Sequence, residues 1–172
     1  NLPLINILAG CGAKITACDK RTKQELGKTA DDLEKIGVTL VCGENYLDNL
    51  KGDIIFKTPG MRPDLPQFEK ARAAGAVVTS EMELFFDLCP CEIFAVTGSD
   101  GKTTTTTLIY EILKKAGYSC YLGGNIGKPL IGEIFNITPE DKVVVELSSF
   151  QLFTMEKSAH TAVITNLAPN HL

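Results

Sequence analysis

The sequence lacks the features that mark membrane-spanning and secreted proteins. No stretch approaches the ~20 predominantly apolar residues that a membrane span requires. No basic start followed by an apolar run and a small-residue cleavage site resembles a signal peptide. We therefore expect a cytoplasmic protein with no membrane partner.

The chain also lacks an excess of basic residues. Its 17 Lys and Arg are outnumbered by 21 Asp and Glu, which gives a net charge of -4. Nucleic-acid-binding proteins need clustered Lys and Arg to displace the counterions of phosphates. We therefore expect no nucleic-acid partner, whereas one phosphorylated small molecule remains compatible with this charge.

The six cysteines lack the setting of a disulfide scaffold, which is typical of short secreted chains. Four of them lie inside apolar runs, where a reduced cysteine packs as a small hydrophobic residue. Cys89 and Cys91 are spaced C-x-C, and no second pair completes a set of four zinc ligands. We expect free thiols and no metal at this pair.

What the sequence does contain is an alternation of helical and strand patterns with short Gly, Pro or polar connections. With 172 residues, 44% of them hydrophobic, the chain has enough apolar material for a core. Such an alternation is typical of an α/β fold, a parallel sheet flanked by helices. We expect helices over 2–10, 30–36, 46–50, 65–74, 81–88, 102–116 and 129–135, and strands over 14–18, 38–41, 53–56, 76–78, 92–96, 119–122, 142–147 and 161–166.

Cys-Pro-Cys at 89–91 interrupts this pattern, and a second series of elements follows it. We place a domain boundary near residue 91. Residues 1–91 are expected to form a Rossmann-like parallel-sheet domain, and residues 92–172 the first part of a P-loop-type α/β ATPase domain.

A glycine-rich loop joins a predicted strand to a predicted helix in the second series. The usual phosphate loop reads G-x-x-x-x-G-K-[ST], in which backbone N–H groups cradle phosphates, Lys reaches the terminal ones and the hydroxyl binds magnesium. Val96 stands where the first glycine of that pattern is expected, so the full pattern fails. The strand–loop–helix context still places free N–H groups and the positive end of a helix dipole at an anion. The loop residues are Gly98, Ser99, Asp100, Gly101, Lys102, Thr103 and Thr104.

The alternative is a glycine-rich turn in which Lys102 and Thr103 only cap a helix. Threonine is common near helix starts, so one or two would need no other reason. Five consecutive threonines, 103 to 107, exceed that need, because β-branched residues lose rotamer freedom in helices. The pattern favours a nucleotide site, although 105 to 107 have no explanation beyond packing.

Other polar residues follow predicted strands. Glu146 ends a buried-type strand, where a carboxylate can reach a magnesium ion beside phosphates or simply be a solvated rim residue. Asn125, in the turn GGNIG, could bond a ligand or occupy a left-handed turn position. His171 could ligate a metal or cap a helix. Asp19 could bind a ribose or a base, or it could be the N-cap of a helix.

Four motifs, in this order and spacing, resemble the ATP-dependent Mur ligases of peptidoglycan synthesis: TGSDGKTT, LGGNIGKPL, VVELSSFQL and ITNLAPNHL. Within that family, GGNIG followed by ELSSFQL is most similar to the branch that adds D-glutamate to UDP-N-acetylmuramoyl-L-alanine. The match is close over 92–172 and looser over 1–91, through ACDKR, TPG and SEMELF.

The resemblance implies a three-domain enzyme that transfers the γ-phosphate of ATP to a substrate carboxylate with Mg²⁺. The resulting acyl phosphate is attacked by the amino group of D-glutamate. A Rossmann-like domain would hold the UDP end, a central domain the ATP, and a C-terminal domain would help to bind ATP and the amino acid. We expect the protein to be a monomer.

The resemblance also implies roles for single residues. Lys102 would bind the β- and γ-phosphates of ATP. Thr103 and Glu146 would hold the first magnesium ion, and His171 a second one. The UDP-muramoyl substrate would be contacted by Asn125 and Ser148, and its uracil end by Asp19, Arg21 and the backbone of Gly60.

The sequence departs from the family pattern in several places. The first strand of the family's Rossmann domain, the end of its central domain and its C-terminal domain are expected before Asn1 and after Leu172, so we interpret both ends as cut and expect no turnover by this piece alone. Asp100 replaces an Asn and brings a negative charge near the phosphates. Alternative functions are another ligase of the superfamily, such as a folylpolyglutamate synthase or the ligase that adds the diamino acid, and a non-catalytic nucleotide-binding module.

Overall fold

The computed structural model describes residues 1–169, and their contacts divide the chain into two compact units. Unit 1 comprises residues 1–55 and 62–78, and unit 2 comprises 56–61 and the chain from 79 onward. The helix at 81–88 therefore packs with unit 2, although the predicted boundary near residue 91 put it in the first domain. The assignment of the two parts to a UDP-substrate domain and an ATP domain stays a prediction.

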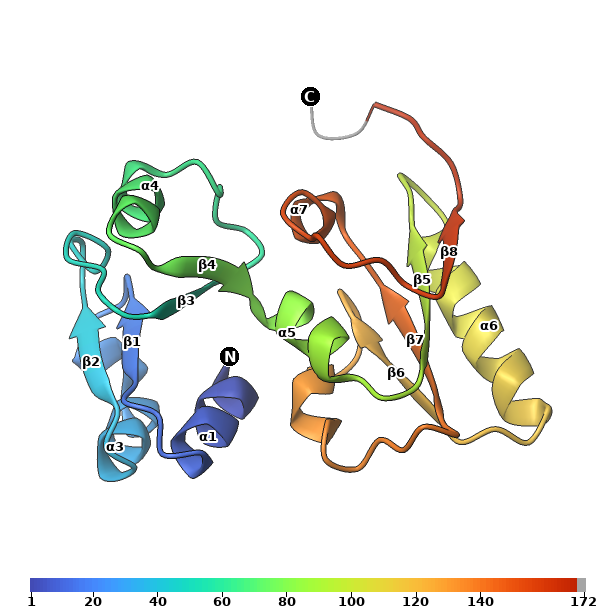
Figure 1. Ribbon diagram of the computed structural model, residues 1–172, viewed down its shortest axis with the longest axis horizontal. Helices are drawn as coiled ribbons and strands as arrows, with labels where there is room; N and C mark the ends of the chain where they lie inside the picture. The colour runs from blue at the N-terminus through green and yellow to red at the C-terminus, as the bar shows by residue number, and fades with distance from the viewer. Residues whose placement is uncertain (170–172) are drawn as a thin grey trace. The chain divides into compact units, whose positions relative to one another are not determined.

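Unit 1 is built from four helices and the strand pair β1–β2, which is parallel with Thr16 opposite Thr39 (Figure 1). The segments β3 and β4 form a second two-stranded sheet. The bounds are α1 Leu2–Gly10, β1 Thr16–Asp19, α2 Lys23–Leu26, α3 Lys28–Lys35, β2 Thr39–Cys42, β3 Ile54–Lys57, α4 Pro66–Ala73 and β4 Val77–Ser80.

The core of unit 1 follows from the apolar faces of its helices. Leu33 of α3 is 7% exposed and Phe68 of α4 is 1% exposed. The predicted helix at 46–50 is wrong: these residues form turns, with Tyr46 N–H donating to Gly43 O and Asp48 N–H to Asn45 O. The Asn and Asp side chains there compete with the backbone for hydrogen bonds and so favour turns over a helix.

Unit 2 contains a four-stranded sheet in the order β6-β7-β5-β8, and every neighbouring pair is parallel. The predicted parallel α/β fold is confirmed. The bounds are α5 Glu81–Leu88, β5 Glu92–Thr97, α6 Lys102–Lys115, β6 Cys120–Gly124, the 3₁₀-helix η1 Leu130–Glu133, β7 Lys142–Glu146, α7 Ser149–Leu152 and β8 Thr161–Ile164.

Strand β7 lies inside this sheet and carries its most deeply buried residues. Val143, Val144 and Val145 each have 0% exposure, so both faces of the strand are covered. A continuous run of β-branched residues is typical of such a strand, because no side faces water. Helix α6 packs along β5, β6 and β7 (Figure 1). The parallel order places the carboxyl ends of all four strands at one edge of the sheet, where the predicted ligand-binding residues follow them.

Within residues 1–169, none of the helices combines the length and apolar character that a membrane crossing would need.

Candidate functional site

The glycine loop at 98–101 has a conformation that strongly favours glycine at its two ends. Gly98 has φ +134° and Gly101 has φ +77°, both in the left-handed region that side chains disfavour. A Cβ atom at Gly98 would also lie 2.1 Å from Thr165 Oγ1. Both glycines are therefore needed for the chain to pass from β5 into α6 at this point.

Helix α6 begins directly after the loop and presents its unpaired N–H groups there. Gly101 is the N-cap without any side-chain cap, and the helix hydrogen bonds begin with Thr105 N–H donating to Gly101 O at 3.0 Å. The N–H groups of Lys102, Thr103 and Thr104 belong to the first turn, which has no intrahelical acceptors for them. Together with the dipole of a 14-residue helix, they form a place that suits an anion.

Lys102 is half-buried and folds back over the loop. Its Nζ donates to Gly98 O at 2.8 Å and to Ser99 O at 2.9 Å. Its ammonium group therefore lies against the loop backbone, beside the first turn of α6. A cation in this place can neutralise the charge of a phosphate held by the N–H groups.

Asp100, the departure from the family pattern, is fixed through its backbone rather than its side chain. Its N–H donates to Asn166 Oδ1 at 2.8 Å, and its carbonyl accepts from Thr165 Oγ1 at 2.6 Å. The residue itself is exposed, so water screens its charge.

Glu146 ends β7 and is buried, with 2% exposure, beside the start of α6. Thr103 Oγ1 donates to Glu146 Oε2 at 2.7 Å, and Asn125 Nδ2 donates to Glu146 Oε1 at 3.2 Å. The strand register explains why Thr103 and Asn125 reach Glu146. Glu146 lies opposite Val96 near the end of β5 and opposite Gly124 at the end of β6.

This cluster suits a magnesium ion chemically. Mg²⁺ prefers hard oxygen ligands beside phosphates, and Glu146 and Thr103 supply a carboxylate and a hydroxyl. Because the Thr103 hydroxyl donates its proton to Glu146, its lone pairs remain available to a cation. When bound, the ion would neutralise charge on phosphate oxygens.

The glycines of the GGNIG turn allow Asn125 to reach Glu146. Gly124 has φ +98°, and a Cβ atom there would lie 2.2 Å from the carbonyl oxygen of Glu146. Asn125 N–H donates to that same carbonyl at 2.8 Å. Asn125 is therefore joined to Glu146 through both its backbone N–H and its side-chain amide, and its contact with a ligand stays a prediction.

Ser148, a predicted substrate contact, is the N-cap of the short helix α7. Its Oγ accepts from Gln151 N–H at 3.3 Å, and its backbone N–H donates to Gln151 Oε1 at 2.9 Å, which together make a capping box. The Ser148 hydroxyl also donates to Gln151 Oε1 at 3.0 Å. A hydroxyl oxygen has a second lone pair, so the cap leaves room for one donor from a ligand.

Asp19 and Arg21 lie together at the end of β1 in unit 1. Arg21 Nη2 bonds Asp19 Oδ2 at 2.8 Å, and the Arg21 side-chain hydrogen bonds hold the pKa of the Asp19 carboxyl below its ordinary value. Gly60 belongs to unit 2 and lies in a turn closed by Met61 N–H donating to Thr58 O at 3.0 Å. The predicted roles of Asp19, Arg21 and Gly60 at the uracil end stay predictions, and His171 lies outside the described residues.

The structure adds residues that sequence reasoning missed. Thr106 has 0% exposure, and its hydroxyl donates to Lys102 O at 2.7 Å, which explains one threonine of the run through packing. Thr165, Asn166 and Ala168 contact the glycine loop at 98–101 from the segment after β8. The motif ITNLAPNHL contains all three, but it carried a prediction only for His171.

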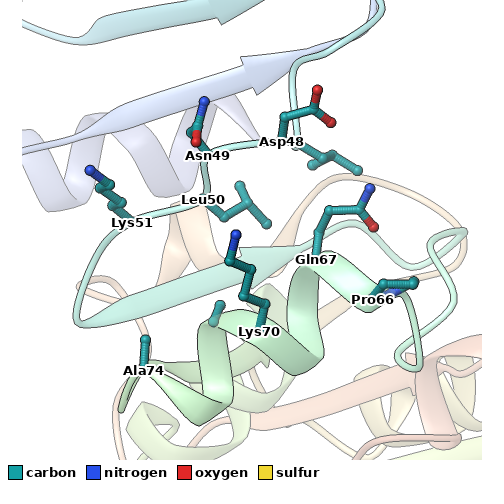
Figure 2. A pocket seen from close by; sticks show the side chains of 10 residues that line it. Asp48, Asn49, Leu50, Lys51, Pro66, Gln67, Lys70 and Ala74 are labelled. Atoms are coloured by element: carbon teal, nitrogen blue, oxygen red, sulfur yellow. The ribbon is translucent and has the colours of Figure 1, made fainter.

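Unit 1 has a separate shallow pocket of about 390 Å³ between α4 and the turn at 47–51. Figure 2 shows Gln67 and Lys70 rising from α4 towards the segment that carries Asn49 and Leu50. None of the predicted site residues lines it. It is therefore not the candidate site.

Comparison with known proteins is consistent with the geometry of the loop and the carboxylate. Residues 96–172 match the Mur ligase middle domain. The chain is 58% identical over 173 residues to the UDP-N-acetylmuramoylalanine–D-glutamate ligase of Clostridium botulinum (strain Loch Maree / Type A3), covering 100% of this chain and 38% of the relative. It is 60% identical over 171 residues to the enzyme of the same name from Acetivibrio thermocellus, covering 99% of this chain and 37% of the relative.

Among solved structures, the chain is similar to the UDP-N-acetylmuramate-alanine ligase MurC of Thermotoga maritima. The TM-score is 0.53 at 25% identity, over 99% of this chain and 39% of that one. The chain thus spans well under half the length of the relatives it matches.

Proposed function

Because this chain belongs to the Mur ligase family, we propose that it is part of an ATP-dependent ligase that adds D-glutamate to UDP-N-acetylmuramoyl-L-alanine. The protein would work in the cytoplasm, as a monomer, on small molecules only. The observation that carries the proposal is the junction of β5, α6 and β7, where Lys102, Thr103 and Glu146 meet around the first turn of a helix.

The chemistry explains why such a junction is needed. A carboxylate is a poor electrophile for amines at neutral pH, since a hydroxide or oxide would have to leave. Transfer of the γ-phosphate of ATP to a carboxylate oxygen turns that oxygen into part of a phosphate leaving group. The amine of D-glutamate then attacks the carbonyl carbon and expels phosphate, which yields the amide.

The residues of this chain would act on charge and position. The N–H groups of 102–104 and the Lys102 ammonium would hold the phosphates, and Thr103 with Glu146 would hold Mg²⁺ against them. Asn125 would orient the Glu146 carboxylate through its 3.2 Å bond while contacting the UDP-substrate together with Ser148. His171 is proposed to bind a second magnesium ion, and Asp19, Arg21 and Gly60 to bind the uracil end.

The test is phosphate release by the full-length protein supplied with ATP, Mg²⁺ and UDP-N-acetylmuramoyl-L-alanine. Adding D-glutamate is expected to stimulate release and to give a product heavier by one glutamyl residue. Release that depends on a diamino acid or on a folate substrate instead would assign another ligase of the superfamily. Nucleotide binding with no turnover on any of these substrates would indicate a binding module.

A further inference from the structure

We propose that Thr165 and Asn166 are positioning residues that hold the phosphate loop in its ATP-binding conformation. The inference rests on the proposed function, and it assigns a role to the segment after β8 that is separate from metal binding by His171.

The backbone of Asp100 is held by hydrogen bonds on both its N–H and its carbonyl side. Its N–H donates to Asn166 Oδ1 at 2.8 Å, and its carbonyl accepts the Thr165 hydroxyl proton at 2.6 Å. Thr165 Oγ1 also lies 3.2 Å from Thr97 O, at the end of β5. Two side chains thus fix the middle of the loop relative to the strand that enters it.

Ser99 is held by the same segment. Its N–H donates to Asn166 O at 3.1 Å, and its hydroxyl donates to Ala168 O and accepts from Ala168 N–H, each at 2.7 Å. The N–H groups of Ser99 and Asp100 are therefore already used within the protein. Those of the first turn of α6 remain to receive the phosphates.

The pairing of β8 with β5 places the segment after β8 next to the glycine loop that follows β5. Strand β8 is parallel to β5 with Thr97 opposite Ile164, so Thr165 emerges at the same edge as Gly98. The approach is close enough that a Cβ atom at Gly98 would collide with Thr165 Oγ1. A loop packed this closely has little freedom to move while both side chains are in place, so its N–H groups stay preorganised for the anion.

The test uses the full-length protein and variants that differ by single polar groups. Thr165→Val removes the hydroxyl and keeps the β-branched shape, and Thr165→Ser keeps the hydroxyl. Asn166→Ala removes the acceptor for Asp100 N–H. The matched control is Asn136→Ala, which breaks a 3.0 Å bond to Glu133 in the loop before β7, at the opposite edge of the sheet.

We expect Thr165→Val and Asn166→Ala to raise the Kd for Mg-ATP and the KM for ATP by about tenfold, the effect of one or two hydrogen bonds. Thr165→Ser should recover most of this affinity. The KM for the UDP-substrate should stay unchanged in all variants, and Asn136→Ala should bind Mg-ATP as the wild type does. A merely structural role would not separate the two substrates in this way.

The proposal is overturned if Thr165→Val binds Mg-ATP within twofold of the wild type, or if Thr165→Ser is impaired as much as Thr165→Val. A wild-type protein that binds no Mg-ATP would overturn the proposed function as well, whereas normal wild-type binding with unimpaired variants would overturn only the positioning role. If one variant fails to fold, as judged by its melting curve, the other variant decides the outcome.

Discussion

The carboxylate of Glu146 is buried and held between the Thr103 hydroxyl and the Asn125 amide. Burying an ionised carboxylate is costly unless charge or hydrogen bonds compensate for it. Two neutral donors provide part of this compensation, and a divalent cation would provide the rest. Glu146 is therefore the residue whose charge, rather than shape, should matter for activity.

Replacing Glu146 by Gln keeps the size of the side chain and removes its charge. We expect kcat/KM to fall by about 10²–10³, the scale of losing one charge-stabilising group in an active site, with a higher requirement for Mg²⁺. The measurement is steady-state kinetics over a Mg²⁺ titration. Glu133→Gln, at an exposed Glu–Asn pair, is the control and should behave as the wild type. Equal Mg²⁺ dependence in Glu146→Gln and the wild type would contradict a metal role.

The environment of Cys89 and Cys91 leads to a prediction that is independent of the ligase activity. The pKa of the Cys91 thiol is raised to about 12, far above its ordinary value of 9.0. Burial is the larger cause, and the neighbouring Cys89 adds to it. Because the thiolate is the reactive form, Cys91 stays a protonated, inert thiol at neutral pH. Iodoacetamide labelling followed by peptide mass analysis should modify the exposed Cys11 first and leave Cys91 unmodified up to about pH 10. Labelling of Cys91 as fast as Cys11 at pH 8 would contradict its burial.

At the scale of elements, the two short helices α2 and α7 both begin with a capping box. Helix α2 starts at Thr22 with a capping box to Glu25, and α7 starts at Ser148 with a capping box to Gln151. Each box satisfies two backbone N–H groups that a helix start would otherwise leave unpaired. Four-residue helices gain little from propensity, so such caps contribute much of their local stability.

Removing the cap at Ser148 by substitution with Ala should lower the free energy of unfolding by about 1 kcal/mol, with a range of about 0.5–2. The matched control is Ser149→Ala, at an exposed first-turn position of the same helix, which should change stability little. Urea denaturation of both variants measures the difference. If Ser148→Ala also raises the KM for the UDP-substrate, the cap residue contacts that substrate as proposed. An unchanged KM would leave Ser148 with its capping role alone.

The elements also show what could be read from the sequence. The apolar run of β7, the loop 98–101 and helix α6 were predictable, because period, glycines and flanking residues all indicated the same structure. Helices α2 and α7 are absent from the predicted elements, although their capping boxes are visible in the sequence as T-x-x-E and S-x-x-Q. The helix predicted over 46–50 is replaced by turns, because the Asn and Asp residues of this segment favour turns over a helix.

The contacts of Thr165 and Asn166 could not have been predicted in the same way. They join residues 65 and 66 positions apart in the sequence. The motif ITNLAPNHL places these residues after a strand, but only the β5–β8 register and the side-chain bonds show that they touch the loop. Long-range side-chain partners depend on strand order, which local patterns do not encode.

At the scale of the whole molecule, the chain covers about 38% of its Clostridium botulinum relative. It contains the glycine loop at 98–101 and the Glu146 cluster, and the proposed reaction also needs groups that bind the amino acid. We therefore expect residues 1–172 alone to bind Mg-ATP without ligase turnover, as measured by calorimetric titration and by phosphate release. A ligase rate equal to that of the full-length protein would contradict this expectation.

In the proposed reaction, the β5–α6–β7 junction activates a carboxylate by transferring phosphate to it. The most direct measurement uses UDP-N-acetylmuramoyl-L-alanine labelled with ¹⁸O in its carboxylate, with ATP, Mg²⁺, D-glutamate and the full-length protein. If the carboxylate oxygen attacks the γ-phosphorus and leaves with it when the amide forms, mass spectrometry will find one ¹⁸O atom in the released phosphate. Phosphate without ¹⁸O would show that the carboxylate is not phosphorylated and would contradict the account.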